Sequence, residues 1–153
     1  MPVQVLLVDD LPEVRIVIAS FLKKDSRLKI ISEASDGIEA VRKAEQLQPD
    51  LILLDIGLPC LNGLDSAHLI RKVSPRSKIL FVSQESSAEI VQEAFRIGAH
   101  GYVVKADMMG DLLAAVDAVL RGDRFVGRRL ADLVTEEHAE ESPASLIRTL
   151  NSI

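Results

Sequence analysis

Short apolar runs alternate with longer amphipathic segments from Val3 to about Gly122. Four of the runs are continuously apolar and rich in branched residues, which is typical of parallel strands covered on both faces. These runs are residues 5–8, 51–54, 79–82 and 102–104. A weaker run at residues 28–32 predicts an edge strand.

Between the runs, apolar residues recur at helical spacing, and Gly, Pro and Asn residues lie where turns are needed. The predicted helices are residues 12–24, 37–48, 64–73, 87–97 and 108–121. Five strand-then-helix units with such short crossovers require parallel strands and right-handed connections. The pattern therefore predicts one α/β domain, residues 1–122, with a doubly wound five-stranded parallel sheet between two layers of helices.

The pattern changes after Gly122. Residues 125–134 are compatible with a further helix, residues 135–142 are acidic, and Ser142-Pro143 begins a short segment with an apolar stripe. From residue 122 onward there are four arginines against six acidic residues. We therefore expect residues 123–153 to form a helical and acidic C-terminal tail with no complete output domain.

Composition excludes several classes of protein. The 153 residues suit one domain, and a formal net charge of −5 with 3% aromatic residues argues against binding to nucleic acid or to an anionic membrane. Apolar runs are far shorter than the roughly 20 residues that span a bilayer. A single cysteine, Cys60, cannot form an internal disulfide and favours a reducing, cytoplasmic location.

Polar residues that can carry chemistry follow the predicted strands. Asp9 and Asp10 end the first strand, Asp55 the third, Ser83 the fourth and Lys105 the fifth. The carboxyl ends of parallel strands share one edge of the sheet, where α/β proteins bind ligands. Crowded carboxylates repel one another unless they share a cation or retain a proton, and a hard divalent ion such as Mg²⁺ fits best.

Magnesium favours one or two carboxylates, a carbonyl oxygen, water and a phosphate oxygen. The available protein ligands are Asp10, Asp55 and the backbone carbonyl of Gly57, with Asp9 acting directly or through water. An aspartate carboxylate can attack a phosphoryl group once the charge is neutralised. Lys105 and the hydroxyl of Ser83 are suited to hold the phosphoryl oxygens.

Together these residues resemble the receiver domain of two-component response regulators over about residues 3–122. The matching motifs are Asp9-Asp10, Leu53-Leu54-Asp55-Ile56-Gly57-Leu58-Pro59 followed by Asn62-Gly63, Phe81-Val82-Ser83, and the run from Gly98 to Lys105. The resemblance implies a flavodoxin-like fold with strand order 2-1-3-4-5.

The resemblance also implies roles for the residues. Asp55 is the expected phosphoacceptor for a sensor histidine kinase or phosphotransfer protein, and Ser83 and Lys105 bind the phosphoryl group. Mg²⁺ is expected on Asp9, Asp10, Asp55 and the Gly57 carbonyl. Ser83 and Tyr102 form the expected switch, in which Tyr102 turns toward the core upon phosphorylation. Such a domain is a signalling phosphoacceptor and not an enzyme.

The sequence says least about the molecule on which the phosphorylated domain acts. Ala106 follows Lys105 where many receivers have proline, a variant similar to the subfamily with a C-terminal helix-turn-helix. We expect contact with a downstream effector protein, with dimerisation left open, and no DNA binding by this chain. The alternative is the isolated receiver of a DNA-binding regulator whose helix-turn-helix domain is missing.

Rival interpretations concern the function and single residues, and the fold is shared between them. A phosphatase of the haloacid-dehalogenase class would begin with its nucleophile and place its acidic pair last, the reverse of the order here. A flavin or nucleotide binder would have a phosphate loop where Asp9-Asp10 stands. Alone, Asp10 would suit an N-cap before Pro12, Lys105 a solvated charge, and Tyr102 a core residue.

Overall fold

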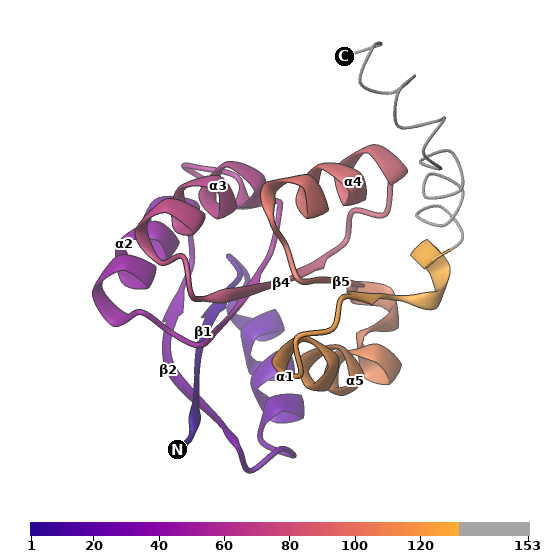
Figure 1. Ribbon diagram of the computed structural model, residues 1–153, viewed down its shortest axis with the longest axis horizontal. Coiled ribbons are helices and arrows are strands. Elements are labelled where there is room, and N and C mark those ends of the chain that lie inside the picture. Colours follow the sequence, from indigo (N-terminus) through magenta and orange to yellow (C-terminus); the bar gives the residue numbers. More distant parts are fainter. Residues whose placement is uncertain (132–153) are drawn as a thin grey trace.

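The structure, a computed structural model, describes residues 1–131. A six-stranded parallel sheet lies between two layers of helices, with α1 and α5 on one face and α2, α3 and α4 on the other (Figure 1). The strands are β1 (Val3–Val8), β2 (Leu28–Ala34), β3 (Leu51–Leu54), β4 (Lys78–Ser83), β5 (Gly101–Val104) and β6 (Phe125–Val126). The helices are α1 (Pro12–Leu22), α2 (Gly37–Leu47), α3 (Gly63–Val73), α4 (Ala88–Ile97), the 3₁₀ turn η1 (Lys105–Asp107) and α5 (Met108–Leu120).

The strand order is β2-β1-β3-β4-β5-β6. β1 and β3 are neighbours, and Val8 pairs with Leu54 at their carboxyl ends. The chain leaves β1 toward α1 on one face and leaves β3 toward α3 on the other (Figure 1). This divergence opens the crevice in which α/β sheets place their ligands.

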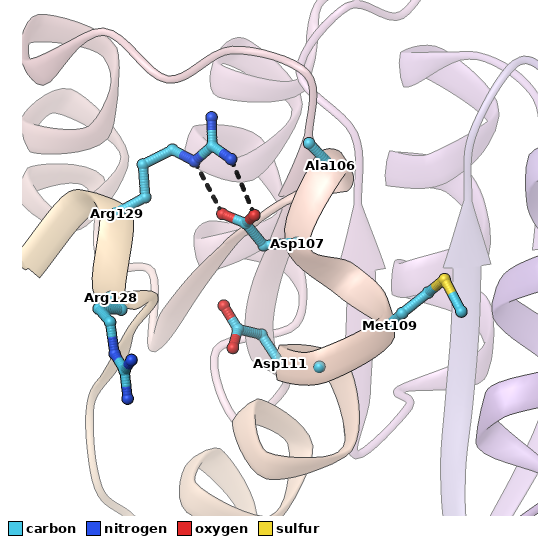
Figure 2. Close-up of a pocket in the computed structure, with 7 residues that line it drawn as sticks. Ala106, Asp107, Met109, Asp111, Arg128 and Arg129 are labelled. Carbon is cyan, nitrogen blue, oxygen red and sulfur yellow. Dashed lines mark hydrogen bonds and ion pairs between the residues drawn. The ribbon is translucent and has the colours of Figure 1, made fainter.

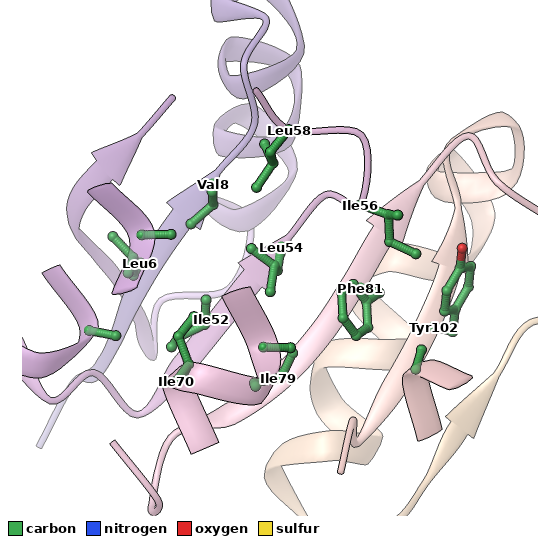
Figure 3. Packing of buried hydrophobic residues seen from close by; sticks show 14 of the residues in the cluster. Leu6, Val8, Ile52, Leu54, Ile56, Leu58, Ile70, Ile79, Phe81 and Tyr102 are labelled. Atoms are coloured by element: carbon green, nitrogen blue, oxygen red, sulfur yellow. The ribbon is translucent and has the colours of Figure 1, made fainter. Parts of the chain in front are cut away.

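Alternate residues of the central strands enter two separate cores. Leu6, Ile52 and Phe81 are buried under α2, α3 and α4 (Figure 3), whereas Leu7, Leu53 and Val82 are buried under α1 and α5. Because side chains alternate across a strand, a strand covered on both faces must be apolar throughout. This burial accounts for the continuous apolar runs of the sequence.

The predicted fold class is confirmed, and all five expected strands and five expected helices are present. The sheet, however, has one strand more than expected: Phe125 and Val126 pair in parallel with Gly101 and Tyr102. The prediction of a helix over residues 125–134 is wrong for its first residues. Phe125 and Val126 form β6, and helical residues begin only at 128. The segment expected to be helical after Pro143 lies outside the described residues.

Side-chain caps begin three helices. Asp36, Asn62 and Ser87 each accept a hydrogen bond from the backbone N–H three residues later, at the starts of α2, α3 and α4. Helix α1 differs, because Leu11 is its N-cap and Pro12 its first residue, with no side-chain cap. Asp10 is therefore not the N-cap of α1, contrary to the alternative interpretation of this residue.

None of the helices in residues 1–131 combines the length and apolar character that a membrane crossing needs.

We predict that His100 makes the fold less stable in mild acid. Its Nδ1 accepts a hydrogen bond from the Ile79 N–H (3.1 Å), and burial, with the charges of Arg71 and Lys78, lowers its pKa below 6.5. The unfolded chain therefore binds more protons than the folded one as the pH falls below about 6.5, and stability declines through the folded-state pKa. Protonation also removes a hydrogen bond worth about 0.5–1.5 kcal/mol.

Urea unfolding at pH 7.5 and 5.5 measures this effect. His100→Asn, whose side-chain oxygen can accept the Ile79 hydrogen bond without titrating, should lose less stability on acidification than the wild type. His68→Asn, at an exposed position of α3, should leave the acid sensitivity unchanged. Equal acid sensitivity of the wild type and His100→Asn would contradict the prediction.

Candidate functional site

Three carboxylates meet at the carboxyl ends of β1 and β3. Backbone hydrogen bonds continue the sheet to its last residues, since the Asp9 N–H donates to Ala34 and the Asp55 N–H donates to Val8. Asp9, Asp10 and Asp55 each offer a carboxylate oxygen, and these three atoms lie within 4.8 Å of one another. Asp9 and Asp55 are buried, with 1% and 6% of their surface exposed.

Lys105 joins the two buried carboxylates. Its Nζ lies 2.7 Å from Oδ2 of Asp9 and 3.0 Å from Oδ2 of Asp55. The lysine comes from the end of β5, two strands away from β3, and only 11% of its side chain is exposed. It is therefore a largely buried counter-ion of the acidic cluster and not a solvated charge.

The charges at the site are incompletely balanced. Burial raises the pKa of Asp9, although Lys105 and the Leu11 N–H act in the opposite direction. Burial would lower the pKa of Lys105, but its contacts with Asp9 and Asp55 outweigh burial and raise it. Oδ2 of Asp9 has the ion pair but no well-oriented hydrogen bond within residues 1–131. Three carboxylates thus face one lysine, and a further cation can neutralise the remaining negative charge.

This donor set fits a magnesium ion. Mg²⁺ prefers hard oxygen ligands, uses one or two carboxylates and retains several waters. Oδ2 of Asp9, which pairs with Lys105 but accepts no hydrogen bond within residues 1–131, and the partly accessible carboxylate of Asp10 meet that preference. Gly57 is exposed two residues after Asp55, in the loop between β3 and α3.

Ser83 and Tyr102 lie beyond the acidic cluster, on β4 and β5. The buried Ser83 hydroxyl accepts a hydrogen bond from the Glu85 N–H (3.2 Å), and the Tyr102 hydroxyl donates to the Glu85 carbonyl (2.8 Å). Tyr102 is wholly buried, and burial raises its pKa. Its ring already lies in the core, the position expected from the sequence for the phosphorylated state (Figure 3).

Arg15 also contacts the site, although it is not among the residues expected from the sequence. Its Nη1 donates to the backbone carbonyl of Asp9 (2.6 Å), and its Nε pairs with Glu33 (2.9 Å) at the end of β2. The guanidinium thereby ties α1 and β2 to the backbone that carries the acidic pair. No local pattern reveals this contact, because it depends on the placement of β2 beside β1.

Comparison with known proteins identifies the class. The family model of the response regulator receiver domain matches residues 5–117. The chain is 32% identical over 133 residues to the nitrate/nitrite response regulator protein NarL of Escherichia coli K12, covering 87% of this chain and 62% of NarL. It is 34% identical over 123 residues to the response regulator protein VraR of Staphylococcus aureus NCTC 8325, covering 80% and 59%.

Solved structures agree. A LuxR-family two-component response regulator from Aurantimonas sp. SI85-9A1 superposes with a TM-score of 0.85 at 29% identity, covering 92% of this chain and all of that one. The response regulator domain of Thermotoga maritima CheB gives a TM-score of 0.73 at 31% identity, covering 79% and 98%. The chain belongs to the receiver domain family of two-component response regulators. It spans about three fifths of the length of the curated relatives NarL and VraR.

Proposed function

We propose that Asp55 accepts a phosphoryl group from the phosphohistidine of a sensor histidine kinase or phosphotransfer protein, in a reaction that requires Mg²⁺. One observation carries the proposal: two buried carboxylates, Asp9 and Asp55, share the single ammonium of Lys105, and Asp10 places a third carboxylate oxygen within 4.8 Å of theirs. Such a cluster attracts a cation and, with a cation, an anionic phosphoryl group.

In the proposed step, a carboxylate oxygen of Asp55 forms a bond to phosphorus. The bond from phosphorus to the donor nitrogen breaks, and its electron pair stays on the imidazole. Lys105 already lies 3.0 Å from Asp55, so its ammonium can pair with an oxygen of the incoming group. The Ser83 hydroxyl, which accepts from Glu85, retains its proton to donate to another phosphoryl oxygen.

Asp9, Asp10, Asp55 and the Gly57 carbonyl would hold Mg²⁺. When bound, the ion supplies the positive charge that lets a carboxylate and a phosphoryl group approach each other. Arg15 holds the Asp9 carbonyl and so orients the acidic pair.

Because the phosphoryl group stays on the domain's own carboxylate, we propose a signalling phosphoacceptor that turns over no external substrate. Its proposed partners are a cytoplasmic phosphodonor and a downstream effector protein, with a second copy of the chain as a further candidate. The acidic balance after residue 122 supports output through protein contacts without nucleic acid. The length of the relatives keeps open the alternative of a receiver within a longer DNA-binding regulator.

Incubation with acetyl phosphate and Mg²⁺ tests the proposal. Intact mass spectrometry should show the gain of one phosphoryl group, and removing Mg²⁺ with EDTA should prevent it. Asp55→Asn should lose the gain completely, because an amide is not a nucleophile here. Asp123→Asn, an exposed carboxylate outside the site, should be phosphorylated like the wild type. Equal phosphorylation of Asp55→Asn and the wild type would refute the role of Asp55.

A further inference from the structure

The chain returns to the sheet after α5 and covers the edge of β5. We call residues 124–131 the strap. The Phe125 N–H donates to the His100 carbonyl (3.1 Å), and Val126 is in register with Tyr102. The edge of the sheet beside Tyr102 is therefore occupied by the chain's own backbone.

Side chains attach the strap to α4. Leu130 is 1% exposed and belongs to the same apolar cluster as Val91, Ala94 and Tyr102. The guanidinium of Arg124 lies 3.8 Å from the centre of the Phe95 ring, also on α4. The strap is thus packed into the core. Withdrawing it would expose the Leu130 side chain to water and lose the stabilisation that its burial provides.

An ion pair connects the strap to the turn that carries Lys105. Nε and Nη2 of Arg129 each lie 2.9 Å from a carboxylate oxygen of Asp107, as Figure 2 shows. Asp107 ends the three-residue turn η1, which Lys105 begins. Residues of the strap and of the start of α5 together line a hollow of about 540 Å³. Figure 2 shows these lining residues. The pair is partly exposed, so Leu130 is the stronger anchor.

Tyr102 lies between the strap and the candidate site. Residues paired in a parallel sheet point to the same face, so the Val126 side chain lies beside that of Tyr102, and both belong to the cluster under α4. On its other side, the Tyr102 hydroxyl reaches the Glu85 carbonyl, and the Glu85 N–H reaches Ser83. Val126 and Leu130 pack in the same apolar cluster as the buried ring, so withdrawing the strap would remove packing around Tyr102. The buried tyrosine and the docked strap therefore belong to one packed unit.

We propose that the strap is the output element of the domain, and that strap docking and phosphorylation of Asp55 stabilise each other. This inference rests on the proposed function. A phosphoryl group on Asp55 recruits Ser83 and Lys105, which orders the Ser83–Glu85 turn under Tyr102 and the turn that ends at Asp107. The first turn binds Tyr102 through the Glu85 carbonyl, and the second binds Arg129 of the strap through Asp107. Coupling is reciprocal: the factor by which a bound phosphoryl mimic strengthens strap docking is the factor by which strap docking strengthens binding of the mimic. Loosening the strap must therefore weaken that binding.

Beryllofluoride with Mg²⁺, a mimic of the acyl phosphate, tests the coupling on the full 153-residue chain. In the wild type, it should slow hydrogen exchange at the amides of Val126 and Leu130. Leu130→Ala should weaken beryllofluoride binding about five-fold or more, the lower end of typical coupling. Arg129→Ala, which removes only the exposed ion pair and so preserves the fold, should weaken it in the same direction but less. Arg128→Ala, an exposed neighbour, should bind like the wild type.

Unchanged affinity in both Leu130→Ala and Arg129→Ala would overturn the coupling, and tighter binding in either would reverse its sign and overturn it too. A failure of the proposed function looks different. In that case the wild type would gain no phosphoryl mass from acetyl phosphate and would not bind beryllofluoride. The proposed coupling would then be refuted together with the proposed function.

Discussion

Replacing Lys105 with methionine should lower the free energy of unfolding by about 3–5 kcal/mol near pH 7, the cost of removing one partner of a buried ion pair. Methionine keeps much of the length of the side chain but not its charge. Asp9 and Asp55 would then face each other without the ammonium that now lies 2.7 and 3.0 Å from them. Magnesium should restore part of the loss, because a bound cation takes over the role of the missing charge.

Urea unfolding with and without Mg²⁺ measures both effects. The stabilisation by Mg²⁺ should be larger in Lys105→Met than in the wild type, where lysine and metal compete for the same carboxylates. Lys43→Met is the matched control, because Lys43 pairs with Glu39 in a partly exposed position, where such pairs contribute about 0.2–1 kcal/mol. The prediction fails if Lys105→Met is as stable as the wild type and gains nothing extra from Mg²⁺.

Gly63→Ala should destabilise the protein by about 1–3 kcal/mol, although alanine normally favours a helix over glycine by about 1 kcal/mol. Gly63 is the first residue of α3, and a Cβ atom there would lie 1.9 Å from the carbonyl oxygen of Asp55 and 2.7 Å from Cα of Ile56. Both are backbone atoms and cannot move without shifting the end of β3. The same shift should slow phosphorylation of Asp55 by acetyl phosphate.

Gly110→Ala is the matched control, since Gly110 lies in α5 and, apart from its chain neighbours and its own helix backbone, no atom of residues 1–131 lies within 4 Å of the added Cβ. It should raise stability by about 0.5–1 kcal/mol. Thermal or urea unfolding of both variants measures the contrast. A stabilised Gly63→Ala variant would show that the backbone of the Asp55 loop can yield, contrary to the close approach in the structure.

Much of the fold was predictable because burial leaves a local record. The strands at residues 51–54 and 79–82 are apolar on both faces, so their sequences differ from those of the amphipathic helices. Asp9, Asp55 and Lys105 each follow such a run, and parallel strands bring their carboxyl ends together. The approximate grouping of the site therefore follows from the sequence.

β6 was not predictable from its own residues. Phe125 and Val126 are too few to show a period, and pairing with Gly101 and Tyr102 is what makes them a strand. The apolar residues that follow them are compatible with a longer helix, and that expectation was wrong at its start. The ion pair of Asp107 and Arg129 likewise joins residues 22 positions apart that no pattern relates.

The receiver fold and the order of the residues that can carry phosphoryl chemistry follow from the amino-acid sequence, because both depend on local periodicity and on which residues end the strands. Three contacts come from the packing of the folded chain: Lys105 bridges Asp9 and Asp55, Arg15 holds the Asp9 carbonyl, and Val126 of the strap pairs with Tyr102. These contacts join separate strands and helices, so their geometry depends on how the elements pack and not on any single segment.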